Sequence, residues 1–104
     1  MSKLVKEEQW IWILVNDQGE KDEFLGRNDE KNNISFIPAF LEKEDALKCY
    51  NLLVTEKEKK YDVQAILYED ITYHCGENGF MLFILDETGD IKEKIVCPPL
   101  KIQV

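Results

Sequence analysis

His74 and Cys75 are neighbours, and they form the one place in the sequence where an imidazole stands beside a thiol. A cysteine becomes a nucleophile when a nearby cationic or basic group lowers the pKa of its thiol. Adjacent residues of a helix point about 100° apart, however, and the negative end of the helix dipole raises the pKa of a nearby thiol. We therefore expect Cys75 to be a small buried residue, with thiol chemistry at His74 and Cys75 as the alternative.

Metal binding is a second kind of chemistry to consider, because three cysteines and one histidine match a tetrahedral zinc site in number. Cys49, Cys75 and Cys97 include no Cys-x-x-Cys pair, and Cys49 lies on a helical stripe that should face a sheet. The segment from Asp86 to Asp90 places three carboxylates around a glycine but lacks the spacing of a calcium-binding EF-hand loop. A hairpin turn explains that segment better, and we expect no metal and no cofactor.

Aromatic residues suggest an interaction surface. Trp10 and Trp12 share one face of a predicted strand, and Phe24 follows nearby. Core packing would account for them, but aromatic residues also dominate the energetics of protein interfaces. A third possibility is a small-ligand pocket between two helices and a sheet, where Tyr50, Tyr73 and His74 would supply polar groups.

The composition and charge of the chain limit the classes of partner that it can bind. Thirteen Lys and Arg against twenty-one Asp and Glu give a net charge of -8, and Arg27 is the only arginine. No basic stripe exists for nucleic acid, and the negative charge would repel anionic lipid surfaces. No apolar run is long enough to span a membrane or to serve as an export signal. Three widely separated cysteines suit a reducing compartment, so we expect a cytoplasmic location.

The elements that must position these residues follow from the hydrophobic pattern. The fold class is predicted to be α+β, a mixed sheet of about five strands with two helices on one face. The expected order is β-(β)-β-α-β-α-β-β within one domain, 1-104, whose residues 1-9 are a charged lead-in. Strands are expected at 10-15, 34-40, 61-67, 80-85 and 91-96, with helices starting near Glu42 and Glu69.

Three details of that pattern are specific. Pro38 cannot donate a ladder hydrogen bond, so the strand 34-40 is predicted to be an edge strand or to end near the proline. The first helix should bury a stripe that includes Ala46 and Cys49, widened by Leu47. Gly79 supplies the left-handed residue that ends the second helix, and the segment 80-85 looks like a central strand buried on both faces.

Most of the chain, from Trp10 to Pro99, resembles a small uncharacterised domain family known mainly from photosynthetic organisms. The matching residues are Glu44-Asp45-Ala46, Val63 to Ile66, Glu69 to Ile71, Cys75 to Phe80 and Pro98-Pro99. The first helix carries Cys49-Tyr50 where such domains tend to have an Arg-Tyr pair. A weaker likeness, through Ile37-Pro-Ala-Phe40 and the acidic helix start after it, is to SseB-like domains. These resemblances imply a fold and no reaction.

The sequence thus favours a non-catalytic protein-interaction module over an enzyme. Its candidate interaction surface is Trp10, Trp12 and Phe24, or an exposed strand edge through which two copies form a homodimer. The alternatives are a small-ligand-binding domain and a thiol- or metal-dependent protein that uses Cys75 and His74. No Gly-x-x-x-x-Gly-Lys or Gly-x-Ser-x-Gly motif occurs, so nucleotide binding and hydrolase chemistry lack their usual signatures.

Overall fold

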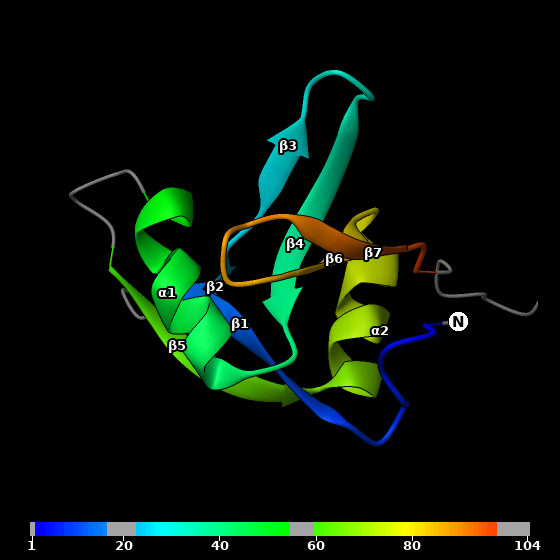
Figure 1. Cartoon of the computed structure of the whole chain (residues 1–104). Helices are drawn as coiled ribbons and strands as arrows, with labels where there is room; N and C mark the ends of the chain where they lie inside the picture. The colour runs from blue at the N-terminus through cyan, green and yellow to red at the C-terminus, as the bar shows by residue number, and fades with distance from the viewer. Residues whose placement is uncertain (1, 17–22, 55–59, 98–104) are drawn as a thin grey trace, which may run out of the picture.

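A computed structural model describes residues 2-16, 23-54 and 60-97 of the chain (Figure 1). The fold is α+β, with a mixed sheet and two helices, so the predicted class is confirmed. Neither helix of the described ranges is long and apolar enough to cross a membrane. The elements, in order, are β1 (Trp10–Asn16), β2 (Glu23–Phe24), β3 (Arg27–Asp29), β4 (Ile34–Phe40), α1 (Lys43–Leu53), β5 (Tyr61–Leu67), α2 (Tyr68–Asn78), β6 (Met81–Leu85) and β7 (Ile91–Ile95).

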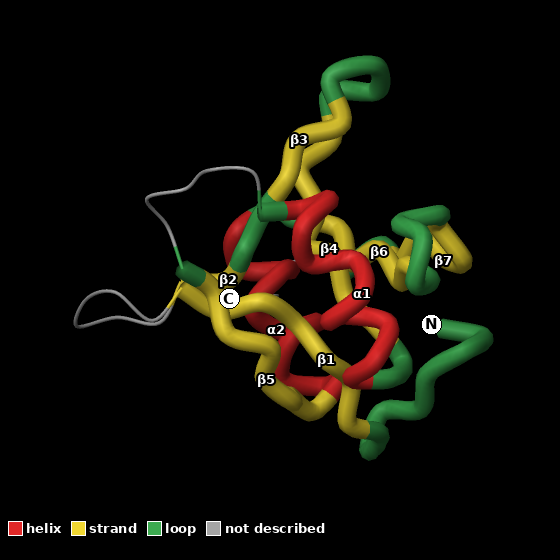
Figure 2. Tube along the Cα trace, turned by 60° about the vertical axis from the view of Figure 1, so that its left-hand side comes forward, coloured by secondary structure: helices red, strands yellow, loops and turns green. Residues whose placement is uncertain are grey.

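The five longer strands lie side by side in the order β5-β1-β4-β6-β7. Strand β1 is antiparallel to both β5 and β4, whereas β4 and β6 are parallel. The short strands β2 and β3 pair with β1 and β4, and Figure 2 shows the β3–β4 hairpin projecting beyond the body of the molecule. The Arg27 guanidinium donates a hydrogen bond to the Leu53 carbonyl, which ties the base of this hairpin to the end of α1.

The two helices cover opposite faces of the sheet, so the prediction that both lie on one face was wrong. One core, here called the α1-side core, joins Ala46 and Cys49 of α1 to the alternate strand residues Phe40, Phe83 and Leu85. The other, the α2-side core, joins Ile71 and Cys75 of α2 to the intervening strand residues, among them Ile13, Ile37 and Leu82. In Figure 1 the two helices accordingly stand on either side of β4.

The strand order explains this placement. The chain passes from β4 over β1 to β5 through α1, and then returns from β5 over β1 and β4 to β6 through α2. Crossovers between parallel strands are right-handed in nearly all proteins. Two right-handed crossovers in opposite directions place their helices on opposite faces, and strands covered on both faces become continuously apolar, as β6 is.

Strand β4 is central, so the edge strand predicted from Pro38 was wrong, whereas the alternative, a strand that ends near the proline, agrees with the end of β4 at Phe40. On one side β4 pairs with β6 along its length. On the other side β3 pairs with Ile34 to Phe36 and β1 pairs with Phe40. Pro38 falls in the interval between these two partners, where the ladder is already interrupted. The proline therefore fits inside the sheet without interrupting the pairing of β4 with β1 or with β3.

The stripe predicted for the first helix is confirmed with one exception. Ala46 and Cys49 of α1 are fully buried, as are Ile71 and Cys75 of α2. Gly79 has a φ of 74° and ends α2 in the left-handed conformation that favours glycine. Leu47, however, is 53 % exposed, so it does not widen the buried stripe as expected. In the turn after β6, the Asp86 carboxylate accepts hydrogen bonds from the Thr88 hydroxyl and the Asp90 amide, at 2.7 and 2.9 Å.

Candidate interaction surface, cysteines and cavity

Among the five longer strands that the structure describes, β5 and β7 are the outer two, and their outer edges differ in how well they are protected. Strand β5 pairs with β1 along all seven of its residues, from Tyr61 opposite Asn16 to Leu67 opposite Trp10. Within the described part of the chain, no strand pairs with the other side of β5. Its outward N–H and C=O groups therefore form a template that another strand can join.

Natural sheets discourage such joining with charged residues, prolines and bulges. Strand β7 has these features, since Lys92, Glu93 and Lys94 occupy its middle and its pairing with β6 is irregular near Ile84. Strand β5 has none of them apart from Asp62, and its pairing with β1 is continuous. The outer edge of β5 is therefore the less protected of the two.

Two of the three predicted surface aromatics lie beside β5. Trp10 is 57 % exposed, and Trp12 is half-buried with the Lys43 ammonium 5.6 Å from its ring centroid. The register places Trp10 opposite Leu67 and Trp12 opposite Ala65 on the same face of the sheet. We call Trp10, Trp12, Ala65 and Leu67 the Trp10 patch.

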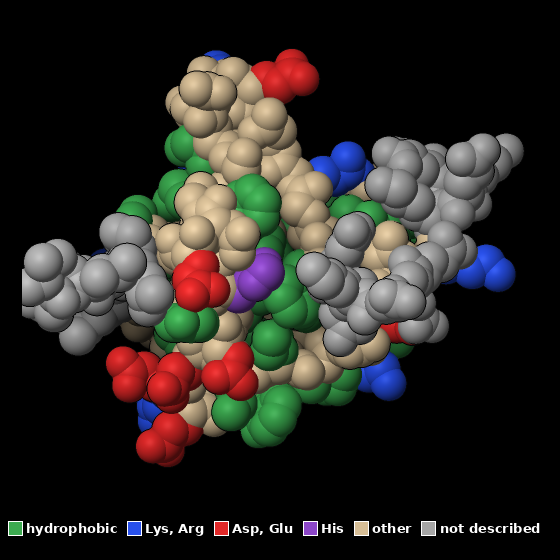
Figure 3. All heavy atoms as spheres, turned by 180° about the vertical axis from the view of Figure 1, so that it is seen from behind, with side chains coloured by type: hydrophobic (Ala, Val, Ile, Leu, Met, Phe, Trp, Pro, Cys, Tyr) green, Lys and Arg blue, Asp and Glu red, His purple; other side chains and the backbone are tan. Residues whose placement is uncertain are grey.

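Phe24 does not belong to this patch, because it packs against the α2-side core on the opposite face. Its ring meets the imidazole of His74 edge-on, with centroids 4.6 Å apart. The only histidine, purple in Figure 3, lies at the surface beside hydrophobic side chains. The imidazole thus packs on an aromatic ring, while Cys75 points into the core with no exposed surface. The structure does not bring His74 and Cys75 together as a nucleophile and its base.

The three cysteines are divided between the two cores. Cys49 lies in the α1-side core, where burial raises the pKa of its thiol. Cys75 and Cys97 lie in the α2-side core and their thiols are in contact. Because the sheet separates Cys49 from the other two, the zinc arrangement considered from the sequence cannot assemble. Among the residues that the structure describes, no group of three or more His, Cys, Asp or Glu side chains is placed to hold a metal ion.

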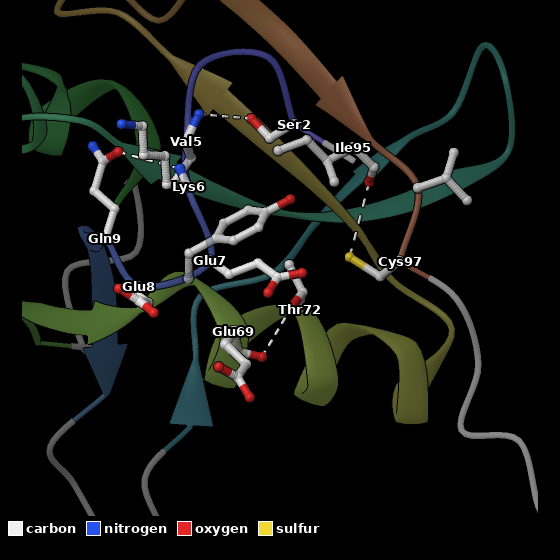
Figure 4. A pocket seen from close by; sticks show the side chains of 12 residues that line it. Ser2, Val5, Lys6, Glu7, Glu8, Gln9, Glu69, Thr72, Ile95 and Cys97 are labelled. Atoms are coloured by element: carbon white, nitrogen blue, oxygen red, sulfur yellow. Dashed lines mark hydrogen bonds between the residues drawn. The ribbon is translucent and has the colours of Figure 1, made fainter.

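A cavity of about 890 Å³ opens between the N-terminal segment, the start of α2 and the end of β7 (Figure 4). Val5, Tyr68, Ile95 and Cys97 supply apolar walls, and Glu7, Glu8 and Glu69 also line it. This is not the pocket predicted between the two helices, which are separated by the sheet. Tyr50 instead accepts a hydrogen bond from the Tyr61 amide at 3.0 Å, and Tyr73 is largely exposed.

Glu93 of β7 fixes one wall of this cavity by holding the N-terminal segment. Its carboxylate accepts hydrogen bonds from the Ser2 hydroxyl at 2.8 Å, the Lys3 amide at 2.9 Å and the Leu4 amide at 3.1 Å. Burial raises the pKa of Glu93, but these hydrogen bonds outweigh it and hold that pKa below its usual value. The charged form is thus the one that holds the segment in place.

We expect Glu93→Gln to lower the free energy of unfolding at pH 7 by about 1 kcal/mol, because a neutral amide accepts weaker hydrogen bonds. A carboxyl whose pKa is lowered by folding stabilises the protein above its unfolded pKa and loses that effect as pH falls through the folded pKa. The difference from wild type should therefore persist down to about pH 4.3 and close below it. Urea denaturation across this pH range measures it.

Glu87→Gln is a matched control, because Glu87 makes only an exposed ion pair with Lys48 at 2.9 Å. Such pairs contribute little to stability. If Glu87→Gln destabilised the protein as much as Glu93→Gln, or if the Glu93→Gln difference did not change with pH, the proposed tether would be wrong.

Comparison of the chain with protein-family models, with curated proteins and with solved structures finds no match. The resemblances described above therefore stay predictions. The features that sequence reasoning missed are the cavity, the tether at Glu93 and the contact between Cys75 and Cys97. Each of them depends on segments far apart in the chain. The alternation in β7, which brings Glu93 and Ile95 to one face, was the only signal for them in the sequence.

Proposed function

We propose that this protein is a non-catalytic interaction module that self-associates when the outer edge of β5 pairs with β5 of a second copy. The observation that carries the proposal is the open, seven-residue edge of β5 beside the exposed Trp10. Strand addition at such an edge is a recurring mode of recognition, because the main chain supplies the hydrogen bonds. The alternative, an enzyme that uses the Cys75 thiol and His74, has less support than this proposal, because His74 contacts Phe24 and Cys75 is buried.

A second copy is the favoured partner because β5 is complementary to itself. Antiparallel pairing about a two-fold axis at Gln64 would place Asp62 opposite Ile66 of the second copy and Val63 opposite Ala65. No like charges would then face each other, whereas parallel in-register pairing would align the two Asp62 carboxylates. The same arrangement extends the row that contains Trp10 and Leu67 to Tyr61 of the second copy, which would cover part of the Trp10 patch.

The net charge of -8 on each copy opposes this association. We therefore expect the dimer dissociation constant to fall several-fold when salt is raised from about 0.05 M to about 0.5 M, because the Debye length shrinks. Sedimentation equilibrium of reduced protein at both salt concentrations measures it. A monomer at every concentration up to about 0.5 mM, where weak interfaces are normally detected, would contradict the proposal.

The cavity near the N-terminus supports a second candidate, a small-ligand-binding domain. Its volume of about 890 Å³ lies in the range of known ligand sites, and its walls combine apolar and polar groups. Thr72→Trp would narrow it from α2, where Thr72 is half-buried. If the cavity binds apolar ligands, Nile red fluorescence should rise with wild type and rise less with Thr72→Trp; an equal response from both would remove this candidate.

A further inference from the structure

We propose that Cys75 and Cys97 form a reversible intramolecular disulfide on exposure to a peroxide, with Cys97 as the residue that reacts first. This inference is independent of self-association through β5. It concerns the opposite end of the sheet and a modification of the protein itself.

Backbone geometry brings the two residues together. Strands β6 and β7 are antiparallel with Leu82 opposite Ile95, so the chain continues from Ile95 to place Cys97 near Phe80. The Phe80 amide donates a hydrogen bond to the Cys75 carbonyl at 2.8 Å. The last turn of α2 and the end of β7 are thus adjacent, and the Cys75 and Cys97 thiols meet in the α2-side core.

The two thiols differ in access. Cys97 lines the cavity, as Figure 4 shows, and is 8 % exposed. Cys75 has no exposed surface. A small oxidant that enters the cavity therefore meets Cys97 first, and the buried Cys75, which contacts Cys97, is the resolving cysteine.

The direction of the pKa shift also differs between the two thiols. Contact with Cys75 lowers the pKa of the Cys97 thiol below its usual value although burial opposes this, and the Cys97 thiol donates a hydrogen bond to the Ile95 carbonyl at 3.9 Å. The same contact with Cys97, followed by burial, raises the pKa of Cys75. Since the thiolate is the reacting form, both access and charge favour the same residue.

The chemistry balances with a peroxide as the two-electron oxidant. The Cys97 thiolate attacks one peroxide oxygen, the O–O bond breaks, and the leaving oxygen takes a proton as water or an alcohol. The Cys75 thiol loses its proton and attacks the Cys97 sulfenic acid, whose hydroxyl leaves as water. Two thiols and one peroxide thus give one disulfide, one alcohol or water and one further water. Thiol-disulfide exchange with a small dithiol reverses the step.

The bond would fasten the end of β7 to α2 and so close a loop that contains β6. Closing such a loop restricts the unfolded chain, and for a domain of this size we expect the thermal unfolding midpoint to rise by roughly 5 to 15 °C. The cavity wall at Cys97 would be fixed at the same time.

The test treats the folded wild-type protein with hydrogen peroxide, blocks free thiols with iodoacetamide and maps the peptides by mass spectrometry. We expect a mass loss of about 2 Da, a Cys75–Cys97 cross-link, an alkylated Cys49 after denaturation, and full reversal by dithiothreitol. Cys49→Ala, which alters only the α1-side core, should form the same cross-link. Cys75→Ala should leave a sulfenic acid on Cys97 that dimedone captures.

The peptide map of the wild-type protein shows whether Cys75 and Cys97 are cross-linked even if a variant fails to fold. A cross-link that includes Cys49, or the absence of any cross-link while Cys97 is oxidised to the sulfinic acid, would overturn the proposal. So would a Cys97 thiol that reacts no faster in the folded protein than in the unfolded chain.

Discussion

Replacing Gln64 with lysine is expected to raise the dimer dissociation constant at least tenfold, a loss of about 1.4 kcal/mol. Gln64 is exposed at the midpoint of β5. In the proposed two-fold pairing it faces Gln64 of the second copy, so the substitution sets two lysines directly opposite each other, where like charges destabilise a strand pair. Sedimentation equilibrium gives the dissociation constant of each protein.

Ile91→Lys is the matched control, because it adds the same charge to an exposed position on the other outer strand, β7. It should leave the dissociation constant unchanged or lower it slightly, because it removes one unit of the net negative charge on each copy. Both substitutions are on the surface, so the thermal unfolding midpoint of each monomer should stay close to wild type. Loss of the dimer with Ile91→Lys and not with Gln64→Lys would move the interface to β7 and contradict the account.

Phe83→Ala is expected to lower the free energy of unfolding by about 3 to 5 kcal/mol. Phe83 is fully buried in the α1-side core, and its ring stacks on Phe36 with centroids 4.1 Å apart and planes 12° from parallel. Because domains of this size are stable by only about 5 to 15 kcal/mol, the variant should be partly unfolded under mild conditions. Urea denaturation measures the change.

Gentler substitutions at the same position test whether the helices pack on opposite faces. Phe83→Leu and Phe36→Leu should couple in a double-mutant cycle, since their rings touch. Phe83→Leu and Ile71→Val should be additive within about 0.5 kcal/mol, because Ile71 lies in the α2-side core across the sheet. A coupling between Phe83 and Ile71 as large as that between Phe83 and Phe36 would contradict the two-faced arrangement.

The sequence predicted elements better than it predicted their arrangement. Hydrophobic spacing identified both buried residues of α1 but wrongly added Leu47, and it did not identify Tyr68 and Gly76 of α2. Gly79 marked the end of α2. The face that each helix covers depends on the strand order β5-β1-β4-β6, which is decided by pairings between segments far apart in the chain. Pro38 was misleading for the same reason. The rule that confines proline to edge strands assumes that a neighbouring strand pairs along the whole length, whereas β1 and β3 each pair with only part of β4.

For the candidate sites too, the sequence predicted features that depend on local spacing and missed those that depend on long-range pairing. Trp10 and Trp12 were correctly placed on one face from alternation alone. Phe24 follows a turn, and its face depends on pairing with Val15, which the sequence did not show. The meeting of Cys75 and Cys97 requires both the β6–β7 register and the packing of α2, so counting cysteines could not have found it.

Amide hydrogen exchange at protein concentrations above and below the dimer dissociation constant tests the central claim most directly. Outward-facing amides of β5 have no partner in a monomer if this edge is open, and they gain one if two copies pair there. We predict that protection within residues 61-67 rises with concentration, while that within residues 91-95 does not change. Unchanged exchange in β5 at a concentration where the protein is dimeric would contradict pairing through this edge.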